Sequence, residues 1–131
     1  MGEIKARIRT AQYEALKAVN KELISLYWDI GETIIKRQKG KSWGKSMVER
    51  LAKNLQQEFP GISGFSPSNL WRMRDFYADY ADNEKLAPLA REIGWTQNYL
   101  ILEKCKDDLR REFYIRMTRL IVAELVRLKM P

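Results

Sequence analysis

The chain has 131 residues, which is long enough for one domain with a hydrophobic core of its own. Its 24 Lys and Arg residues outnumber its 17 Asp and Glu residues, which gives a net charge of +7. A basic chain favours an anionic partner: nucleic acid is the first candidate and an acidic membrane surface the second. The absence of His and the single Cys exclude Ser-His-Asp and Cys-His catalysis, His-based metal sites and an intrachain disulfide framework.

The N-terminal region is predicted to form one long helix, or two helices in line, from residue 3 to about residue 38. Its apolar side chains recur at spacings of three and four, which places them on one helical face. They are Ile4, Ile8, Ala11, Ala15, Val19, Leu23, Tyr27, Ile30 and Ile34. The stripe spans roughly 45 Å if the helix is straight, so we expect a bend or a partner. Gly31 favours either a kink or close backbone packing against Trp28.

A basic loop with two glycines follows the long helix, in the string KGKSWGKS of residues 39–46. Only three residues separate its glycines and no strand pattern precedes them, so the loop is not a nucleotide-binding P-loop. One interpretation is a turn that presents lysines to a DNA backbone, with Lys39, Lys41 and Lys45 as the phosphate contacts.

Two further helices are predicted within residues 46–80, which form one candidate helix–turn–helix unit. The first ends at Pro60-Gly61, and the second opens at Ser66, a natural N-cap, with Pro67 in its first turn. The apolar residues that mark them are Val48, Leu51, Leu55 and Phe59 in the first helix and Leu70, Met73, Phe76, Tyr77 and Tyr80 in the second.

The second of these helices carries residue types that hydrogen-bond to guanine and adenine edges. Asn69, Arg72 and Arg74 are expected to face outward, where they would contact bases or phosphates. Trp71 is interpreted as a core or interface aromatic rather than as a base-stacking platform.

The string LAREIGWTQNYL, residues 89–100, has the spacing of a helix–turn–helix and follows a polar loop, residues 81–85, which is the best internal hinge. Its expected parts are a shared apolar face of Leu89, Ala90 and Ile93, a left-handed turn at Gly94, a helix cap at Thr96 and a core residue at Leu100.

The second helix of a helix–turn–helix enters the DNA major groove, which makes Thr96, Gln97 and Asn98 candidates for base contacts. The alternative is an ordinary helical corner that binds no nucleic acid. The surplus charge favours that alternative, because residues 1–44 hold nine Lys and Arg against five Asp and Glu, whereas residues 81–131 hold ten against eight.

A final helix is predicted after a cap at Asp107 or Asp108, and Cys105 just before it is interpreted as a small core residue. The buried side of this helix is expected to carry Leu109, Phe113, Met117, Leu120, Ile121, Leu125 and Leu128. Because no β alternation of any length occurs, the fold class is all-α: one compact domain, residues 1–131, of about six helices. The chain shows neither a secretory signal nor an apolar run of about 18 residues, which predicts a cytoplasmic protein without a membrane span.

Four ordered strings together resemble a known family. They are LYWDIGETI, WGKSMVERLAKNLQQEFPGISGFSPSNLWRMRDFY, LAREIGWTQNYLILEKC and REFYIRMT, and over residues 4–118 they are similar to the N-terminal domain of the bacterial YhcG-type PD-(D/E)XK nuclease family. The resemblance implies a helical, helix-turn-helix-like domain placed before a nuclease domain. The nuclease activity belongs to that later domain and carries over to no residue here. The tail after Thr118 departs from the family's continuation.

No catalytic constellation is found in the sequence, because the carboxylates are scattered and Glu3-Ile-Lys5 matches a nuclease motif only as a tripeptide on a predicted helix. The expected function is a non-catalytic module, without cofactor or metal, that binds DNA through a helix-turn-helix-like unit and accompanies a nuclease. The alternative is a protein-interaction or dimerisation module without direct DNA binding, with a homodimer formed through the first and last helices.

Overall fold

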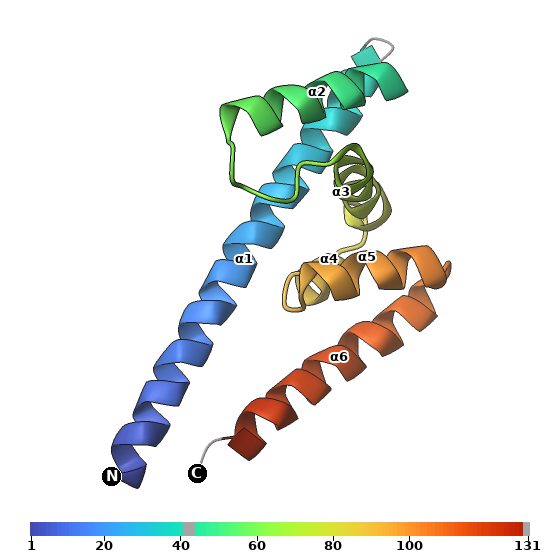
Figure 1. Ribbon diagram of the computed structural model, residues 1–131. Helices are drawn as coiled ribbons and strands as arrows, with labels where there is room; N and C mark the ends of the chain where they lie inside the picture. The colour runs from blue at the N-terminus through green and yellow to red at the C-terminus, as the bar shows by residue number, and fades with distance from the viewer. Residues whose placement is uncertain (41–43, 130–131) are drawn as a thin grey trace. The chain divides into compact units, whose positions relative to one another are not determined.

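The structure is a computed structural model that describes residues 1–40 and 44–129, and these residues form six helices and no strand. The helices, labelled in Figure 1, are α1 (Gly2–Gly40), α2 (Lys45–Glu58), α3 (Pro67–Tyr80), α4 (Leu86–Ala90), α5 (Trp95–Lys104) and α6 (Asp108–Lys129). The all-α prediction, with about six helices and a long first one, is confirmed. None of the helices in the described ranges has both the length and the apolar content that a membrane span needs.

The helices pack as two units. Unit 1 contains Met1–Ser25 and the chain from Asn83 onward, and unit 2 contains Leu26–Asp82. The chain passes from one unit to the other within α1 and again in the polar loop of residues 81–85. This loop was predicted from the sequence to be the best internal hinge. In unit 1, α4 and α5 both pack on α6; in unit 2, α2 packs on α3.

In unit 2, Gly31 lets α1 approach the backbone of α3. A Cβ atom at position 31 would overlap the carbonyl oxygen of Met73 and lie 2.7 Å from its carbonyl carbon. Of the two alternatives for this glycine, close backbone packing is therefore confirmed, but the partner is the carbonyl group of Met73 and not Trp28 as predicted. Trp28 lies one turn away and packs edge-on against Phe76 and Tyr77.

The core of unit 2 follows the predicted pattern. Ser66 Oγ accepts a hydrogen bond from the backbone N–H of Asn69 at 3.1 Å, and Pro67 is the first residue of α3, so the predicted cap is confirmed. The buried apolar side chains of this unit include Ile34, Val48, Ala52, Leu70, Met73, Phe76 and Tyr80.

In unit 1, the core lies between α4, α5 and one side of α6. Its buried residues include Leu86, Ala90, Ile93, Ile101, Leu102, Cys105 and Ile115. The interpretation of Cys105 as a core residue is confirmed. Leu100, which was expected in the core, is 39% exposed, because the neighbouring Ile101 takes the buried position on α5.

Helix α6 turns outward the face that was predicted to be buried. Leu109, Phe113, Met117, Leu120, Ile121 and Leu125 are 40–79% exposed, and the side chain of Leu128 lies outside the described ones. Arg111 and Ile115 are buried instead. The prediction is wrong because α4 and α5 cover the opposite side of the helix.

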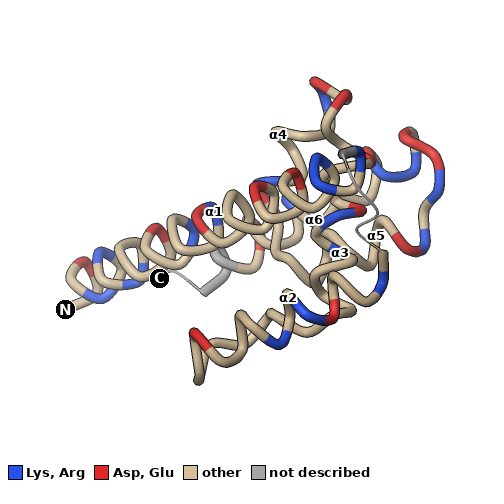
Figure 2. The backbone as a smooth tube through the Cα atoms, turned by 90° about the horizontal axis from the view of Figure 1, so that it is seen from above, with Lys and Arg blue, Asp and Glu red and all other residues tan. Residues whose placement is uncertain are grey.

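The apolar stripe of α1 is buried only in its second half. Tyr27 and Ile34 are buried, whereas the earlier members Ile4, Ile8 and Val19 are more than half exposed. Basic and acidic residues are interspersed along this exposed first half of the helix (Figure 2), so it presents apolar side chains and charged side chains of both signs. Helix α1 continues as a single helix through both halves.

Candidate nucleic-acid interface

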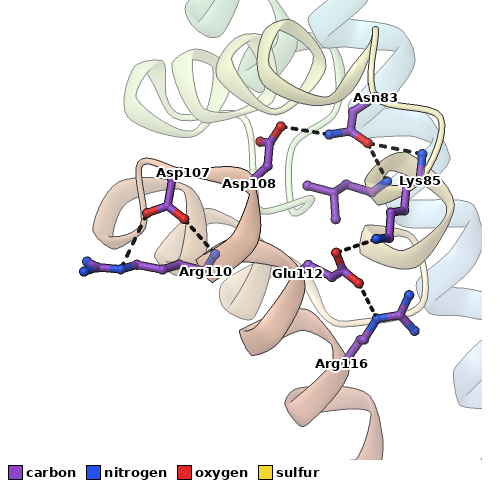
Figure 3. A network of polar contacts seen from close by, with 8 residues as sticks. Asn83, Lys85, Asp107, Asp108, Arg110, Glu112 and Arg116 are labelled. Atoms are coloured by element: carbon purple, nitrogen blue, oxygen red, sulfur yellow. Dashed lines mark hydrogen bonds and ion pairs between the residues drawn. The ribbon is translucent and has the colours of Figure 1, made fainter.

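The corner between α4 and α5 begins at a capped helix end. Asn83 Oδ1 accepts hydrogen bonds from the backbone N–H groups of Lys85 and Leu86, at 3.1 and 2.9 Å (Figure 3). The side-chain amide of Asn83 donates to a carboxylate oxygen of Asp108, at 3.1 Å. One residue therefore satisfies the first N–H groups of α4 and fixes this helix to the N-terminal end of α6.

Ion pairs continue this contact along α6. Lys85 Nζ lies 2.8 Å from Glu112 Oε1, and Arg116 Nε lies 2.9 Å from Glu112 Oε2 (Figure 3). The hydrogen bonds from Lys85 and then from Arg116 lower the pKa of the Glu112 carboxyl below its ordinary value. Because Lys85 and Arg116 are exposed, these pairs set the orientation of α4 on α6 more than they add stability.

Asn98 holds the turn between α4 and α5 from the inside. Its Nδ2 donates to the carbonyl oxygens of Ala90 at 2.8 Å and Gly94 at 3.1 Å, with a longer contact to Ile93. The residue has no exposed surface. The expectation that Asn98 contacts DNA bases is therefore wrong, because its amide is buried and already donates to the turn.

The N-terminal half of α1 is tied to the same turn. Asn20 Nδ2 donates to the carbonyl oxygen of Ile93 at 3.1 Å. Two asparagines from distant parts of the sequence thus donate to carbonyl groups at the end of α4 and in the turn that follows it. The corner is fixed by side-chain hydrogen bonds as well as by apolar packing.

Two details of the predicted turn are wrong. Gly94 has φ −71° and ψ 164°, which is an extended conformation and not a left-handed one. Gly94 is itself the N-cap and α5 begins at Trp95, so Thr96 lies inside the helix and does not cap it. The hydrogen bonds of Asn98 close the turn, and a left-handed residue is therefore not needed.

Thr96 and Gln97 are both exposed in the first turn of α5. The side chain of Gln97 lies over Gly94, since a Cβ atom on that glycine would overlap Gln97 Oε1. Trp95 and Tyr99 pack edge to face beside them, with ring centroids 6.0 Å apart. The corner thus presents a hydroxyl and an amide that can hydrogen-bond to base edges or phosphates.

Asn69 of α3 does not face outward as predicted. It is 9% exposed, and its Nδ2 donates to the carbonyl oxygen of Gly64 at 2.7 Å. It also contacts the hydroxyl of Tyr27, whose pKa is raised by burial and lowered to a smaller extent by the hydrogen bond with Asn69. Asn69 therefore holds the loop that leads into α3, and a DNA base cannot reach it.

The two arginines of α3 are half-buried. Arg74 Nε donates to Gln38 Oε1 at 2.9 Å, and its Nη1 lies 3.0 Å from Asp75 Oδ1. Its guanidinium also lies 5.8 Å from the ring centroid of Trp71. Arg74 is thus held by partners within unit 2, and contact with a phosphate would have to compete with them. Arg72 also has a partner within the protein.

The candidate lysines lie on both sides of a segment that the structure does not describe. Lys39 is exposed in the last turn of α1, and Lys45 is exposed at the start of α2. Lys41, the third predicted phosphate contact, lies outside the described residues. The structure thus leaves Lys39, Lys45, Thr96 and Gln97 as exposed members of the predicted set, with the lysines in unit 2 and the other two in unit 1.

An apolar groove beside α5 was not found by sequence reasoning. It has a volume of about 670 Å³ and lies between α5 and α6. Its lining residues are Leu100, Ile101, Lys104, Cys105, Leu109, Arg110, Phe113 and Tyr114. Periodicity shows that α6 has an apolar face, but only the packing shows that this face borders a groove.

A family model of the DUF1016 N-terminal domain matches residues 3–122 of the chain. The match extends from the first turn of α1 into α6 and confirms the family resemblance that the four strings carry. Comparison with curated proteins and with solved structures gave no match. Within the described ranges, no cluster of three or more His, Cys, Asp or Glu side chains is arranged to hold a metal ion.

Proposed function

This chain belongs to the DUF1016 N-terminal domain family, and on that premise we propose that it is a non-catalytic helical module that binds DNA beside a PD-(D/E)XK nuclease. The contact is made by the first turn of α5. The observation that carries this proposal is the difference in burial among three consecutive residues. Asn98 is buried and fixes the turn, while Thr96 and Gln97 are exposed.

A fixed corner favours DNA recognition because the contacting groups are held before binding. In a helix–turn–helix the first residues of the second helix meet the base edges. The backbone N–H groups at a helix N-terminus also attract phosphate, and Gly94, the N-cap of α5, offers no side chain that would occupy them. The exposed Lys39 and Lys45 would add contacts to the DNA backbone that do not depend on sequence.

Fluorescence anisotropy on labelled duplex DNA at 50 and 200 mM salt tests the proposal. We expect affinity to fall steeply with salt, and K39E and K45E each to reduce the slope of log affinity against log salt by about 1. Gln97→Ala should weaken binding by roughly 5–150-fold, the 1–3 kcal/mol of a base contact. Thr10→Ala, which changes an exposed threonine of α1, is the matched control and should leave affinity unchanged. No salt-dependent binding at micromolar protein would overturn the proposal.

A second candidate function is protein interaction without direct DNA contact. It is favoured by the exposed apolar face of α6, because monomers rarely expose a contiguous apolar patch of more than a few hundred Å². The two candidates are compatible, since helix–turn–helix proteins commonly bind paired half-sites as dimers. The anisotropy assay separates them, because only the first predicts salt-dependent DNA binding.

A further inference from the structure

The outward side of α6 forms a continuous surface of nine exposed residues, here called the α6 outer face. Its members are Leu109, Arg110, Phe113, Tyr114, Met117, Leu120, Ile121, Glu124 and Leu125. At 100° per residue these positions cover less than half of the helix circumference. The helix packs through the opposite side, where Arg111 and Ile115 are buried.

The residues of the α6 outer face are arranged so that two copies of the helix, running in opposite directions, would present complementary side chains to each other. Met117 is its central residue, and two charges of opposite sign, Arg110 and Glu124, lie seven residues before and seven residues after it. Leu109 and Leu125 lie eight residues away on either side. A second α6 that runs antiparallel therefore places arginine opposite glutamate, leucine opposite leucine and methionine opposite methionine.

The size of the α6 outer face also suits such a pair. Its seven apolar side chains are 40–79% exposed. At about 100 Å² each, roughly half of what a large side chain buries, they offer on the order of 700 Å². A standard stable interface buries about 800 Å² per partner.

We propose that two copies of this chain pair through the α6 outer face, antiparallel, around a two-fold axis at Met117. Such an interface is isologous, so each contact occurs twice. Phe113 packs against the partner's Ile121, and Arg110 pairs with the partner's Glu124. Arg110 can reach across because its side chain is 73% exposed, even though it also contacts Asp107.

The groove between α5 and α6 has an occupant in this arrangement. It lies at the N-terminal end of the α6 outer face, where Leu109 and Phe113 form one wall and Leu100 of α5 another. In an antiparallel pair this end faces the C-terminal part of the partner's α6. The partner's Ile121 and Leu125 therefore enter the groove and cover Leu100, which is 39% exposed in the single chain.

Sedimentation velocity of the full chain from 1 to 100 µM, without DNA, tests the pairing. We expect a dimer, and we expect Met117→Asp to raise its dissociation constant at least a hundredfold, because two carboxylates would meet at the axis without partners. Ile62→Asp is the matched control: it places the same charge on another exposed apolar residue, in unit 2, and should leave the dimer intact. Because both side chains are exposed, circular dichroism should show both variants folded.

A charge exchange tests the antiparallel register. Arg110→Glu and Glu124→Arg should each weaken the dimer about tenfold, since each places like charges opposite one another twice. The double variant R110E/E124R should return the dissociation constant to within about threefold of the original. A chain that is monomeric at 100 µM overturns the proposal. A dimer that Met117→Asp leaves intact, or one that the double exchange fails to restore, places the contact elsewhere and also overturns it. Neither result depends on whether the chain binds DNA.

Discussion

The side-chain amide nitrogen of Asn98 lies 2.8 Å from the carbonyl oxygen of Ala90, the last residue of α4, and both residues are fully buried. This hydrogen bond joins the end of α4 to the first turn of α5 across the turn between them. It explains how a corner with a helix of five residues keeps a defined geometry. A helix this short has little stability of its own and depends on tertiary contacts.

Asn98→Ala should destabilise the protein by about 1–3 kcal/mol, because buried carbonyl groups of the turn lose their donor. The free energy of unfolding from urea denaturation measures this. Gln97→Ala, one residue earlier but exposed, is the control and should change stability by less than about 0.5 kcal/mol. Equal effects of the two substitutions would mean that Asn98 does not hold the turn.

The sequence predicted the corner but not the roles of its residues. Spacing located the two helices and the turn, and it selected Ala90 and Ile93 as core residues, both of which are buried. It could not separate Asn98 from Gln97, because both are amides in the same helical turn. Which of the two side chains points inward is decided by where the carbonyl groups at the end of α4 lie. Their position relative to α5 depends on the angle between α4 and α5.

Gly31→Ala should cost about 1–3 kcal/mol or more, since the new methyl group would overlap the carbonyl group of Met73 and force α1 and α3 apart. Thermal unfolding followed by circular dichroism measures the loss. Gly2→Ala adds the same methyl group to the same helix, where no atom lies within 4 Å, and should be neutral or slightly stabilising. If the two variants unfold alike, α1 and α3 do not approach at this point.

Glu112 should make part of the stability sensitive to acid. Its pKa is lowered in the folded protein by Lys85 and Arg116, so its contribution is fully present above the ordinary glutamate pKa of about 4.3 and is lost as the pH falls through the lowered value. Glu112→Gln should therefore be less stable than the original at pH 7, with a difference that shrinks below about pH 4. Urea denaturation at pH 7, 5 and 3.5 measures this. A difference that stays constant over this range would contradict the assignment.

Helix α6 shows a limit of periodicity as a predictor. The spacing of its apolar residues correctly indicated a helix with one apolar face, and burial of that face was the natural expectation. Yet α4 and α5 pack on the side that carries Arg111 and Ile115. Arg111 is accommodated there because its Nε donates to the carbonyl oxygen of Cys105 at 2.8 Å. Periodicity identifies an apolar face on a helix. Whether that face packs in the protein's own core or is left exposed depends on which other helices pack against it, here α4 and α5.

Gly61 and Gly64 offer a comparison between backbone strain alone and strain with a steric clash. Both have positive φ, at 89° and 104°, so alanine is strained at either position. Around Gly61 no atom lies within 4 Å of an added Cβ, whereas at Gly64 the Cβ would overlap the hydroxyl of Tyr27. Gly61→Ala should therefore cost about 1–2 kcal/mol.

Gly64→Ala should cost roughly 1–3 kcal/mol more than that, because Tyr27 is buried and cannot move aside without disturbing the core of unit 2. The free energies of unfolding of the two variants, measured together, give the difference. Tyr27→Phe removes the hydroxyl, so in that background the two glycine substitutions should have nearly equal costs. If Gly64→Ala keeps its larger cost after the hydroxyl is removed, the added strain comes from the backbone of the loop and not from Tyr27.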